Sequence, residues 1–215
     1  MSALVQAPPR PKHDQIFEAG RRVFLRHGYR ASMDRVAAEA GVSKQTVYKH
    51  FGSKEGLFRA IIEGCSEEFL TVLVERPAGA GDPGTTLRRL GERFLGLLLD
   101  PESVALHRML VAEAPRFPDL AQEFYRAGPG RSVRRLAGYL EQQDRAGMLA
   151  VPDPVLSAEQ FLGALTAHVH LRAVLGVAAA SLDEVETIVG HAVSSFLDAH
   201  APHGALMERR ASKTA

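Results

Sequence analysis

The sequence predicts an all-α fold of about nine helices, in which three helices are followed by a larger helical body. Apolar residues recur at the spacing of a helix through nearly the whole chain. No stretch shows the alternation of apolar and polar residues that is typical of a half-buried strand. The 215 residues are 46% hydrophobic and 24% charged, so the chain has enough apolar material for a core.

Serines mark helix starts and glycines mark helix ends in the first third of the chain, in the way that N-cap and C-cap residues do. Ser32, Ser43 and Ser53 each precede a stretch with helical periodicity. The glycines that close such stretches are Gly28, Gly41 and Gly52. The helices expected here are residues 12–27, 33–40, 43–51 and 54–74.

Proline and glycine divide the rest of the chain. Loops are expected at residues 76–84 and 151–154, which read RPAGAGDPG and VPDP. The remaining helices are expected at 85–99, 103–113, 118–145 with a break at 128–130, 157–175 and 183–200. The predicted organisation is a disordered lead-in at 1–11, a first domain at 12–58, a connecting helix at 54–74, a second domain at 76–200 and a flexible tail at 201–215.

Positive charge is concentrated in the first 60 residues, which hold 11 Lys and Arg against 5 Asp and Glu. A basic end on a mildly acidic body suits a polyanionic partner. The one cysteine, Cys65, excludes an intrachain disulfide and favours a reducing compartment. We find neither an apolar signal segment nor an apolar run long enough to span a membrane, so the sequence predicts a cytoplasmic protein with no membrane partner.

Two short helices joined by a glycine turn, after a longer helix, are typical of a helix-turn-helix, whose second helix enters the major groove of DNA. If Val47 faces inward, the 100° step of a helix places Gln45 at about 160° and Lys49 at about 200°, directly outward. Glutamine pairs with adenine and lysine with guanine in that groove. The flanks and N-terminal end of this ridge carry Thr46, Tyr48 and Lys44. Hydroxyl groups such as those of threonine and tyrosine bind phosphates.

Neighbouring helix starts add candidate phosphate contacts. The first turn of the helix at 54–74 presents free N–H groups and Lys54. Ser32 and Met33 begin the second helix and can reach the opposite DNA backbone.

The stretch ASMDRVAAEAGVSKQTVYKHFGSKEGLFRAII, residues 31–62, closely resembles the DNA-binding domain of TetR-family transcriptional regulators, through AGVS, TVYKHF and SKEGLF. The resemblance implies a homodimeric, ligand-responsive regulator: a repressor released from a palindromic double-stranded DNA operator by a small apolar or amphipathic effector. It also places a base or phosphate contact on His50, but the helical wheel turns His50 half inward, at about −60°, which favours a phosphate contact or a structural role over base reading. The predicted DNA-binding residues are Ser32, Met33, Ser43, Lys44, Gln45, Thr46, Tyr48, Lys49, His50 and Lys54.

Residues 106–131, together with AEQFLGALTAHVHLRAVLG, are similar to the C-terminal domain of an AcrR-like subgroup of that family. In such proteins the body encloses an effector cavity, and the last two helices form a dimer bundle. The predicted effector-binding residues are Leu90, Phe94, Leu97, His107, Phe124, Leu136, Tyr139, Leu140, Phe161, Leu165 and His168. On the last helix, a broad apolar surface predicts a dimer interface that consists of Val185, Ile188, Val189, Ala192, Val193 and Phe196. The resemblance adds Leu162 and Val169 of the penultimate helix to this interface.

Two other classes of protein are alternatives to this interpretation. One is a helix-turn-helix regulator that has no small-molecule effector. The other is a helical enzyme, for which the chain offers no GxSxG, HExxH or phosphate-loop motif. His168 and His170 are two residues apart and point about 200° away from each other on a helix, so they cannot share a metal ion. The sequence therefore predicts no catalytic residue, metal site or cofactor.

Overall fold

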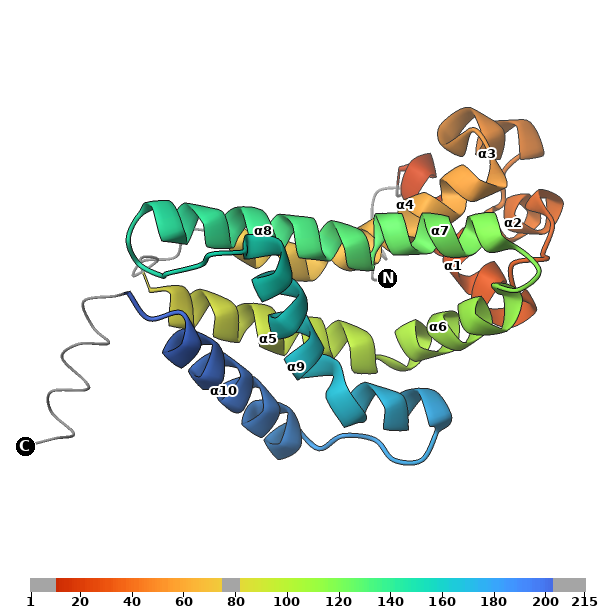
Figure 1. The fold of residues 1–215 in the computed structure, drawn as a ribbon. Coiled ribbons are helices and arrows are strands. Elements are labelled where there is room, and N and C mark those ends of the chain that lie inside the picture. Colours follow the sequence, from red (N-terminus) through yellow and green to blue (C-terminus); the bar gives the residue numbers. More distant parts are fainter. Residues whose placement is uncertain (1–10, 75–81, 203–215) are drawn as a thin grey trace, which may run out of the picture.

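The computed structural model describes residues 11–74 and 82–202 (Figure 1). These residues form ten α-helices and one short 3-10 helix without any strand, which confirms the predicted all-α fold. The bounds are α1 Lys12–His27, α2 Met33–Ala40, α3 Lys44–Phe51, α4 Lys54–Leu70, a 3-10 turn Thr71–Leu73, α5 Pro83–Leu99, α6 Pro101–Glu113, α7 Pro118–Ala127, α8 Pro129–Arg145, α9 Pro154–Leu175 and α10 Leu182–Ala199. Most of the expected lead-in, part of the 76–84 loop and most of the tail lie outside the described residues.

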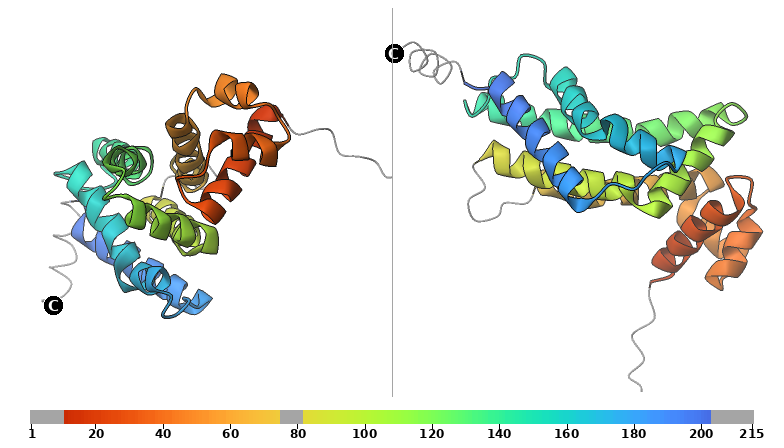
Figure 2. Two further views of the ribbon diagram at one scale, coloured as in Figure 1. Left: turned by 90° about the vertical axis from the view of Figure 1, so that its right-hand side faces the viewer. Right: turned by 90° about the horizontal axis from the view of Figure 1, so that it is seen from below.

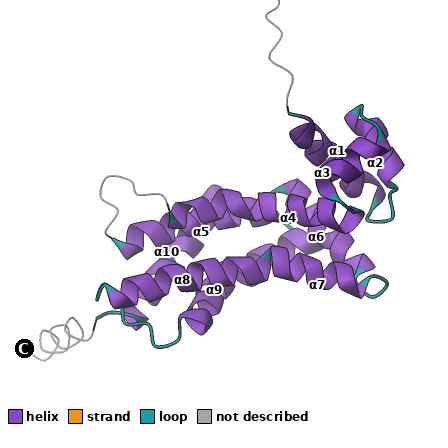
Figure 3. Cartoon of the chain, turned by 90° about the horizontal axis from the view of Figure 1, so that it is seen from above, coloured by secondary structure: helices purple, strands orange, loops and turns teal. Residues whose placement is uncertain are grey.

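Helices α1, α2 and α3 gather at one end of an elongated body and form the head (Figures 1 and 2). Helix α4 runs from the head along the body and packs against α5, α7 and α8. Helices α7 and α8 lie nearly in line, with only Gly128 between them (Figure 3). Helix α9 packs against α8 and α5, and α10 covers α5 and α9. Helix α4 is thus the element that the head and the body share.

Serine caps begin α2, α3 and α4, as the sequence predicts. The side chain of Ser32 accepts a hydrogen bond from the Arg35 N–H at 3.3 Å. Ser43 accepts one from Thr46 at 3.1 Å, and the Ser53 side chain does the same for the N–H of the third residue after it. Each cap satisfies an N–H group that has no partner inside its helix. Gly41 has φ of 64°, the left-handed conformation that turns the chain sharply from α2 into α3.

Three helices of the body begin earlier than expected, because Asp-Pro pairs were interpreted as helix breakers. Asp82, Asp100 and Asp153 are N-caps whose carboxylates accept N–H hydrogen bonds, and a proline follows each of them at the first helical position. Proline is well tolerated at the first helical position, because the N–H group that it lacks would have no partner within the helix there. The fixed φ of proline also suits a helix. At Asp100 the same residue both ends α5 and begins α6.

The buried apolar side chains form two clusters. The junction core joins the head to the body, and its members include Ile16, Phe24, Tyr29, Val36, Val47, Leu57, Phe58, Leu106, Leu110 and Leu120. The distal core fills the other end of the body, and its members include Leu87, Leu90, Leu136, Leu140, Phe161, Leu165, Val189, Val193 and Phe196. Since residues of α6 and α7 complete the junction core, the head does not rest on α4 alone.

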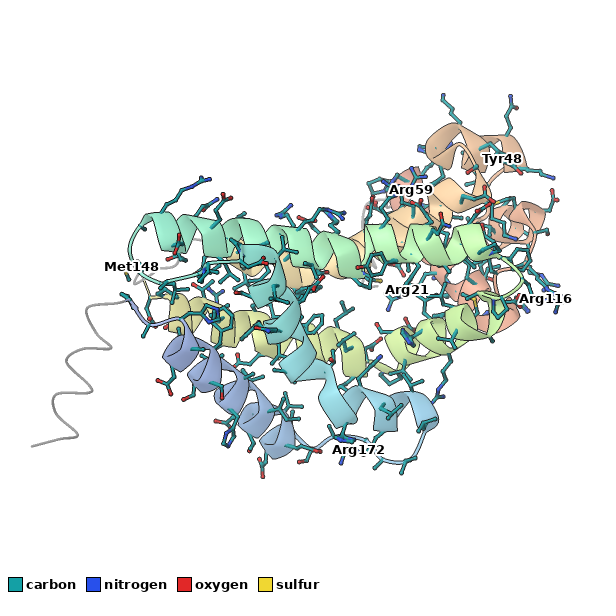
Figure 4. The ribbon with its side chains drawn as sticks, in the orientation of Figure 1. Arg21, Tyr48, Arg59, Arg116, Met148 and Arg172 are labelled. Carbon is teal, nitrogen blue, oxygen red and sulfur yellow. The ribbon has the colours of Figure 1, made fainter. Side chains whose placement is uncertain are left out.

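Polar and aromatic contacts also connect the head and α4 with α6 and α7. Arg21 of α1 forms an ion pair with Glu102 of α6 at 2.6 Å. Arg59 of α4 pairs with Glu123 of α7, where α4 passes that helix (Figure 4). The Tyr29 ring lies 5.7 Å from the Phe117 ring, edge to face. These contacts would have to change if the head moved relative to the body.

No helix within residues 11–74 and 82–202 combines the length and the apolar character that crossing a membrane requires.

Candidate functional site

The outer face of α3 is polar and exposed to solvent. Val47 is 0% exposed and anchors the helix in the junction core. Gln45 and Lys49 are exposed, and neither side chain makes a hydrogen bond or an ion pair within the part of the chain that the structure describes. Tyr48 is 41% exposed and lies on α3 at the tip of the head (Figure 4). The burial of these side chains agrees with the wheel that places Gln45 and Lys49 outward.

Lys44, at the N-terminal end of this face, already has a partner. Its Nζ lies 2.8 Å from an Asp34 carboxylate oxygen at the start of α2. This hydrogen bond raises the pKa of Lys44 above its usual range. Both side chains are exposed, so the pair is a weak one that solvent screens. Lys44 would have to leave Asp34, or share it, in order to contact DNA.

Lys54 at the start of α4 lies over an aromatic ring. Its Nζ is 4.4 Å from the centre of the Tyr29 ring, a cation–π arrangement. Partial burial lowers the pKa of Lys54, and the nearby Glu55 and Glu113 carboxylates oppose that shift. The Tyr29 hydroxyl donates to Glu55 at 3.1 Å, and burial raises the pKa of this hydroxyl. Lys54 is therefore held at the head–body junction by the residue that also touches Phe117.

The other predicted DNA-contact residues fall into two groups. Ser32, Ser43 and His50 are exposed, and Thr46 is half-buried with its hydroxyl 2.8 Å from that of Ser43. Met33 differs, because its side chain is 5% exposed and belongs to the junction core. The predicted contact of Met33 with the DNA backbone would therefore have to come from its main chain rather than from its side chain. Its backbone N–H remains at the first position of α2.

A cavity of about 380 Å³ lies in the head-proximal half of the body. It is bounded by α4, α5, α6, α7, α8 and α9, and most of its surface is apolar. Phe94, Leu97, His107 and Phe124 line it, and all four are on the predicted effector-binding list. Helix α4 contributes residues that the sequence interpretation did not assign to any pocket: Ile62, Cys65, Ser66 and Phe69. These four residues recur at spacings of three and four along one face of α4, and this periodicity was the sequence signal that could have identified them.

The remaining predicted effector residues do not line this cavity. His168 is exposed on α9, and Tyr139 is partly buried against the distal core. Leu90, Leu136, Leu140, Phe161 and Leu165 are between 0% and 1% exposed and belong to the distal core. They are packing residues at the other end of the body, which periodicity alone cannot distinguish from residues that line a cavity.

The cavity contains two histidines, of which only one was predicted. The rings of His107 on α6 and His170 on α9 meet edge to face, with centroids 5.0 Å apart. Burial lowers the pKa of both, and for His107 the proximity of His170 adds to the shift. The His170 Nδ1 atom is buried and has no hydrogen-bond partner among residues 11–74 and 82–202.

The predicted dimer interface is largely covered within the chain itself. Val185 and Ile188 are partly buried against the distal core. Six others, Leu162, Val169, Val189, Ala192, Val193 and Phe196, are at most 8% exposed. Helices α5 and α9 cover the apolar surface of α10, so that surface does not by itself require a partner chain. The apolar side chains that do remain open on α9 include Leu156, Leu171 and Leu175, which are 48%, 52% and 66% exposed.

Comparison with known proteins assigns both parts of the chain. Residues 16–61 match the tetR family of bacterial regulatory proteins. Residues 85–202, more than half of the chain, match the C-terminal domain of AefR-like transcriptional repressors. The chain is also 30% identical to the HTH-type transcriptional regulator TcmR of Streptomyces glaucescens over 142 residues, which cover 62% of each protein. It is 36% identical to the repressor SCO4008 of Streptomyces coelicolor, over 34% of the chain and 38% of SCO4008.

The chain thus spans less than two thirds of the length of these two curated relatives. Solved structures are matched over more of their length. A TetR-family regulator from Mesorhizobium loti is 30% identical, with a TM-score of 0.73 over 88% of this chain and 96% of that one. The flavonoid-responsive regulator FrrA is 34% identical, with a TM-score of 0.71 over 89% and 98%. The chain belongs to the TetR family of DNA-binding transcriptional regulators.

Proposed function

We propose that the protein is a homodimeric repressor that leaves a palindromic operator when a small, largely apolar effector enters the cavity. Gln45, Lys49 and Lys44 contact bases, and Tyr48, Thr46 and Lys54 position the DNA backbone. Two copies of α3 held about one DNA turn apart, ~34–36 Å, would read two half-sites. The description of the matched C-terminal domain as that of a repressor supports repression rather than activation.

The observation that carries this proposal is the extent of α4. The helix begins at Lys54 and lines the cavity with Ile62, Cys65, Ser66 and Phe69. At 1.5 Å per residue, the cavity wall is only about 12–22 Å along the same helix from Lys54. An effector that displaces α4 would therefore also displace Lys54 and its Tyr29 partner. A coupling free energy of about 1–3 kcal/mol would change DNA affinity by about 5- to 150-fold.

The same proposal includes a homodimer, as is typical of the family. The exposed strip of α9 that carries Leu156, Leu171 and Leu175 is the surface that supports it, together with the exposed face of α10. Gly163 and Ala164 lie exposed between these leucines and would let a partner helix approach closely. Leu171→Glu should therefore raise the monomer fraction in sedimentation velocity, whereas Val193→Glu should unfold the chain.

A compound panel tests the proposed response to an effector. The full-length protein is screened by thermal shift against lipophilic compounds, and each hit is then added to a mobility-shift titration with DNA that flanks the protein's own gene. A hit that raises the melting temperature and weakens DNA binding supports the proposal. If compounds bind without any change in DNA affinity, or if none binds, a regulator without a small-molecule effector is favoured instead.

Lys54→Ala should weaken binding to all DNA sequences by a similar factor. A phosphate contact contributes to affinity without reading bases, and each lost contact reduces the slope of log K against log[salt] by about 0.9. We expect a change of about 2 for a dimer, measured by fluorescence anisotropy at several salt concentrations. Arg145→Ala removes an exposed cation from the end of α8 and should leave the slope unchanged. An unchanged slope for Lys54→Ala would contradict its assignment as a phosphate contact.

Asp34→Asn should tighten DNA binding about two- to fivefold, because it releases Lys44 from an exposed ion pair and removes a negative charge beside the DNA face. The gain should appear with operator and with unrelated DNA alike. Glu186→Gln on α10 removes the same charge far from the head and serves as the control. Weaker binding by Asp34→Asn would show that Asp34 helps Lys44 rather than competing for it.

A further inference from the structure

The cavity has few polar groups that are free to bind a ligand. Ser66 donates its hydroxyl hydrogen to the Ile62 carbonyl at 3.0 Å, and Ser132 donates to the Gly128 carbonyl at 2.9 Å. Thr166 likewise donates to a backbone carbonyl of its own helix at 3.0 Å. These hydroxyls are committed to satisfying backbone oxygens in α4, α8 and α9. The polar side chains that remain include the two histidines and the hydroxyls of Ser103 and Tyr125, and Tyr125 is 60% exposed.

Among the described residues that line the cavity there is no lysine and no arginine. Glu159 is the one described lining residue with a formal charge, and it is exposed. A carboxylate or phosphate ligand would thus enter an apolar cavity without a cation to pair with, which is strongly unfavourable. The nearby negative charge of Glu159 would repel it further. These features disfavour an anionic effector in this cavity.

The histidine pair is suited to an uncharged hydroxyl group. Burial keeps both imidazoles in their neutral forms near pH 7, since it lowers the pKa of each. A neutral imidazole offers one N–H donor and one lone-pair acceptor. In His170 the Leu98 backbone interacts with the ring, while Nδ1 is buried and has no hydrogen-bond partner in the described part of the chain. An acceptor of this kind costs stability until a donor reaches it.

The apolar part of the cavity favours flat rings. Phe69, Phe94 and Phe124 come from three different helices and line its wall. The Phe124 ring lies edge to face against His107, with centroids 6.1 Å apart. Aromatic side chains gain from offset or edge-to-face contact with another ring. A volume of about 380 Å³ is near the small end of ligand cavities, so a compact ligand fits better than a long chain.

We propose that the effector is a compact, uncharged aromatic compound whose hydroxyl group is held by His107 and His170. This inference rests on the proposal that the cavity binds an effector, and it adds the chemical class. The hydroxyl donates to one imidazole and accepts from the other, while the ring system fills the space between the phenylalanines. Binding would bring α6 and α9 together at the cavity and press on α4 from the opposite side.

Four probes with one ring system test the proposal: naphthalene, 2-naphthol, 2-naphthoate and 2-(aminomethyl)naphthalene. Their dissociation constants with the full-length protein are measured at pH 7 by calorimetry or by competition. We expect 2-naphthol to bind about tenfold more tightly than naphthalene, as one well-placed hydrogen bond permits. The carboxylate should bind least well. The amine shows whether Glu159 recruits a cation instead, and preference for the amine would overturn the proposal.

Variants show whether the histidines cause the preference. His107→Leu and His170→Leu should each reduce the advantage of 2-naphthol over naphthalene while leaving naphthalene binding nearly unchanged. His107→Asn keeps a hydrogen-bonding group and should retain part of the advantage. His27→Leu, an exposed histidine on α1, is the control and should behave as the wild type. Equal binding of 2-naphthol and naphthalene, or no binding of 2-naphthol, would overturn the proposed class.

The operator assay separates this outcome from failure of the proposed function. If another probe binds and weakens operator binding while 2-naphthol has no advantage, the chemical class is wrong and the ligand-responsive repressor stands. If 2-naphthol binds through the histidines without any effect on operator affinity, the class of ligand is supported and the regulatory proposal fails.

Discussion

Phe58→Ala should destabilise the protein by about 3–5 kcal/mol, the range for deletion of a fully buried phenylalanine. Phe58 is 0% exposed, and its ring lies 5.9 Å from that of Phe24 and 5.4 Å from that of Tyr29. The substitution would open a cavity at the point where α1, α4 and the body meet. Since whole domains are stable by only about 5–15 kcal/mol, the loss should be evident in urea unfolding followed by circular dichroism.

The form of the transition is as informative as its midpoint. The junction core includes Leu106, Leu110 and Leu120 from the body, so the head and the adjoining helices should lose stability together. Tyr125→Ala removes a ring that is 60% exposed and should cost about 0.5 kcal/mol or less. A second transition in Phe58→Ala that leaves the body at its wild-type stability would show that the head folds independently. That result would contradict the continuity of the junction core.

Gln45→Ala should relax base preference at one base pair of each half-site without weakening non-specific binding. A bidentate contact from glutamine to adenine discriminates by about 1–3 kcal/mol, which corresponds to about 5- to 150-fold. The lost side chain is uncharged, so the release of counterions and hence the salt dependence should not change. Selection of bound sequences from randomised DNA measures the preference directly.

Gln142→Ala, an exposed glutamine of α8, is the matched control for this selection and should recover the wild-type sequence. Lys44→Ala should affect a different position, and its effect includes the exposure of Asp34, which loses its partner. If neither Gln45→Ala nor Lys44→Ala altered the selected sequence, the reading face assigned to α3 would be wrong.

The head was predictable from sequence because its determinants are local. Ser32, Ser43 and Ser53 lie within a few residues of the N–H groups that they cap, and Gly41 supplies the left-handed turn between two short helices. One inward residue, Val47, then fixes which side of α3 faces out. The burial of the Met33 side chain was less predictable, because a residue at a helix start can point either to the core or to the surface.

The body was less predictable because its site depends on how distant helices pack. Leu136 and Phe124 look alike in an apolar stripe, yet one is in the distal core and the other lines the cavity. Which face of α10 stays open depends on where α5 and α9 lie, and no local pattern encodes that. The sequence places His170 beside His168 only, whereas its partner in the fold is His107, more than 60 residues away in sequence.

Footprinting on DNA that flanks the protein's own gene tests the central claim most directly, namely that the exposed face of α3 reads an operator. The wild type and a Gln45→Ala/Lys49→Ala variant are compared on the same fragment. We predict two symmetric protected half-sites centred about 34–36 Å apart, or a multiple of that distance, and loss of the pattern in the variant. An asymmetric or absent footprint, or one that the double substitution leaves unchanged, would contradict the account.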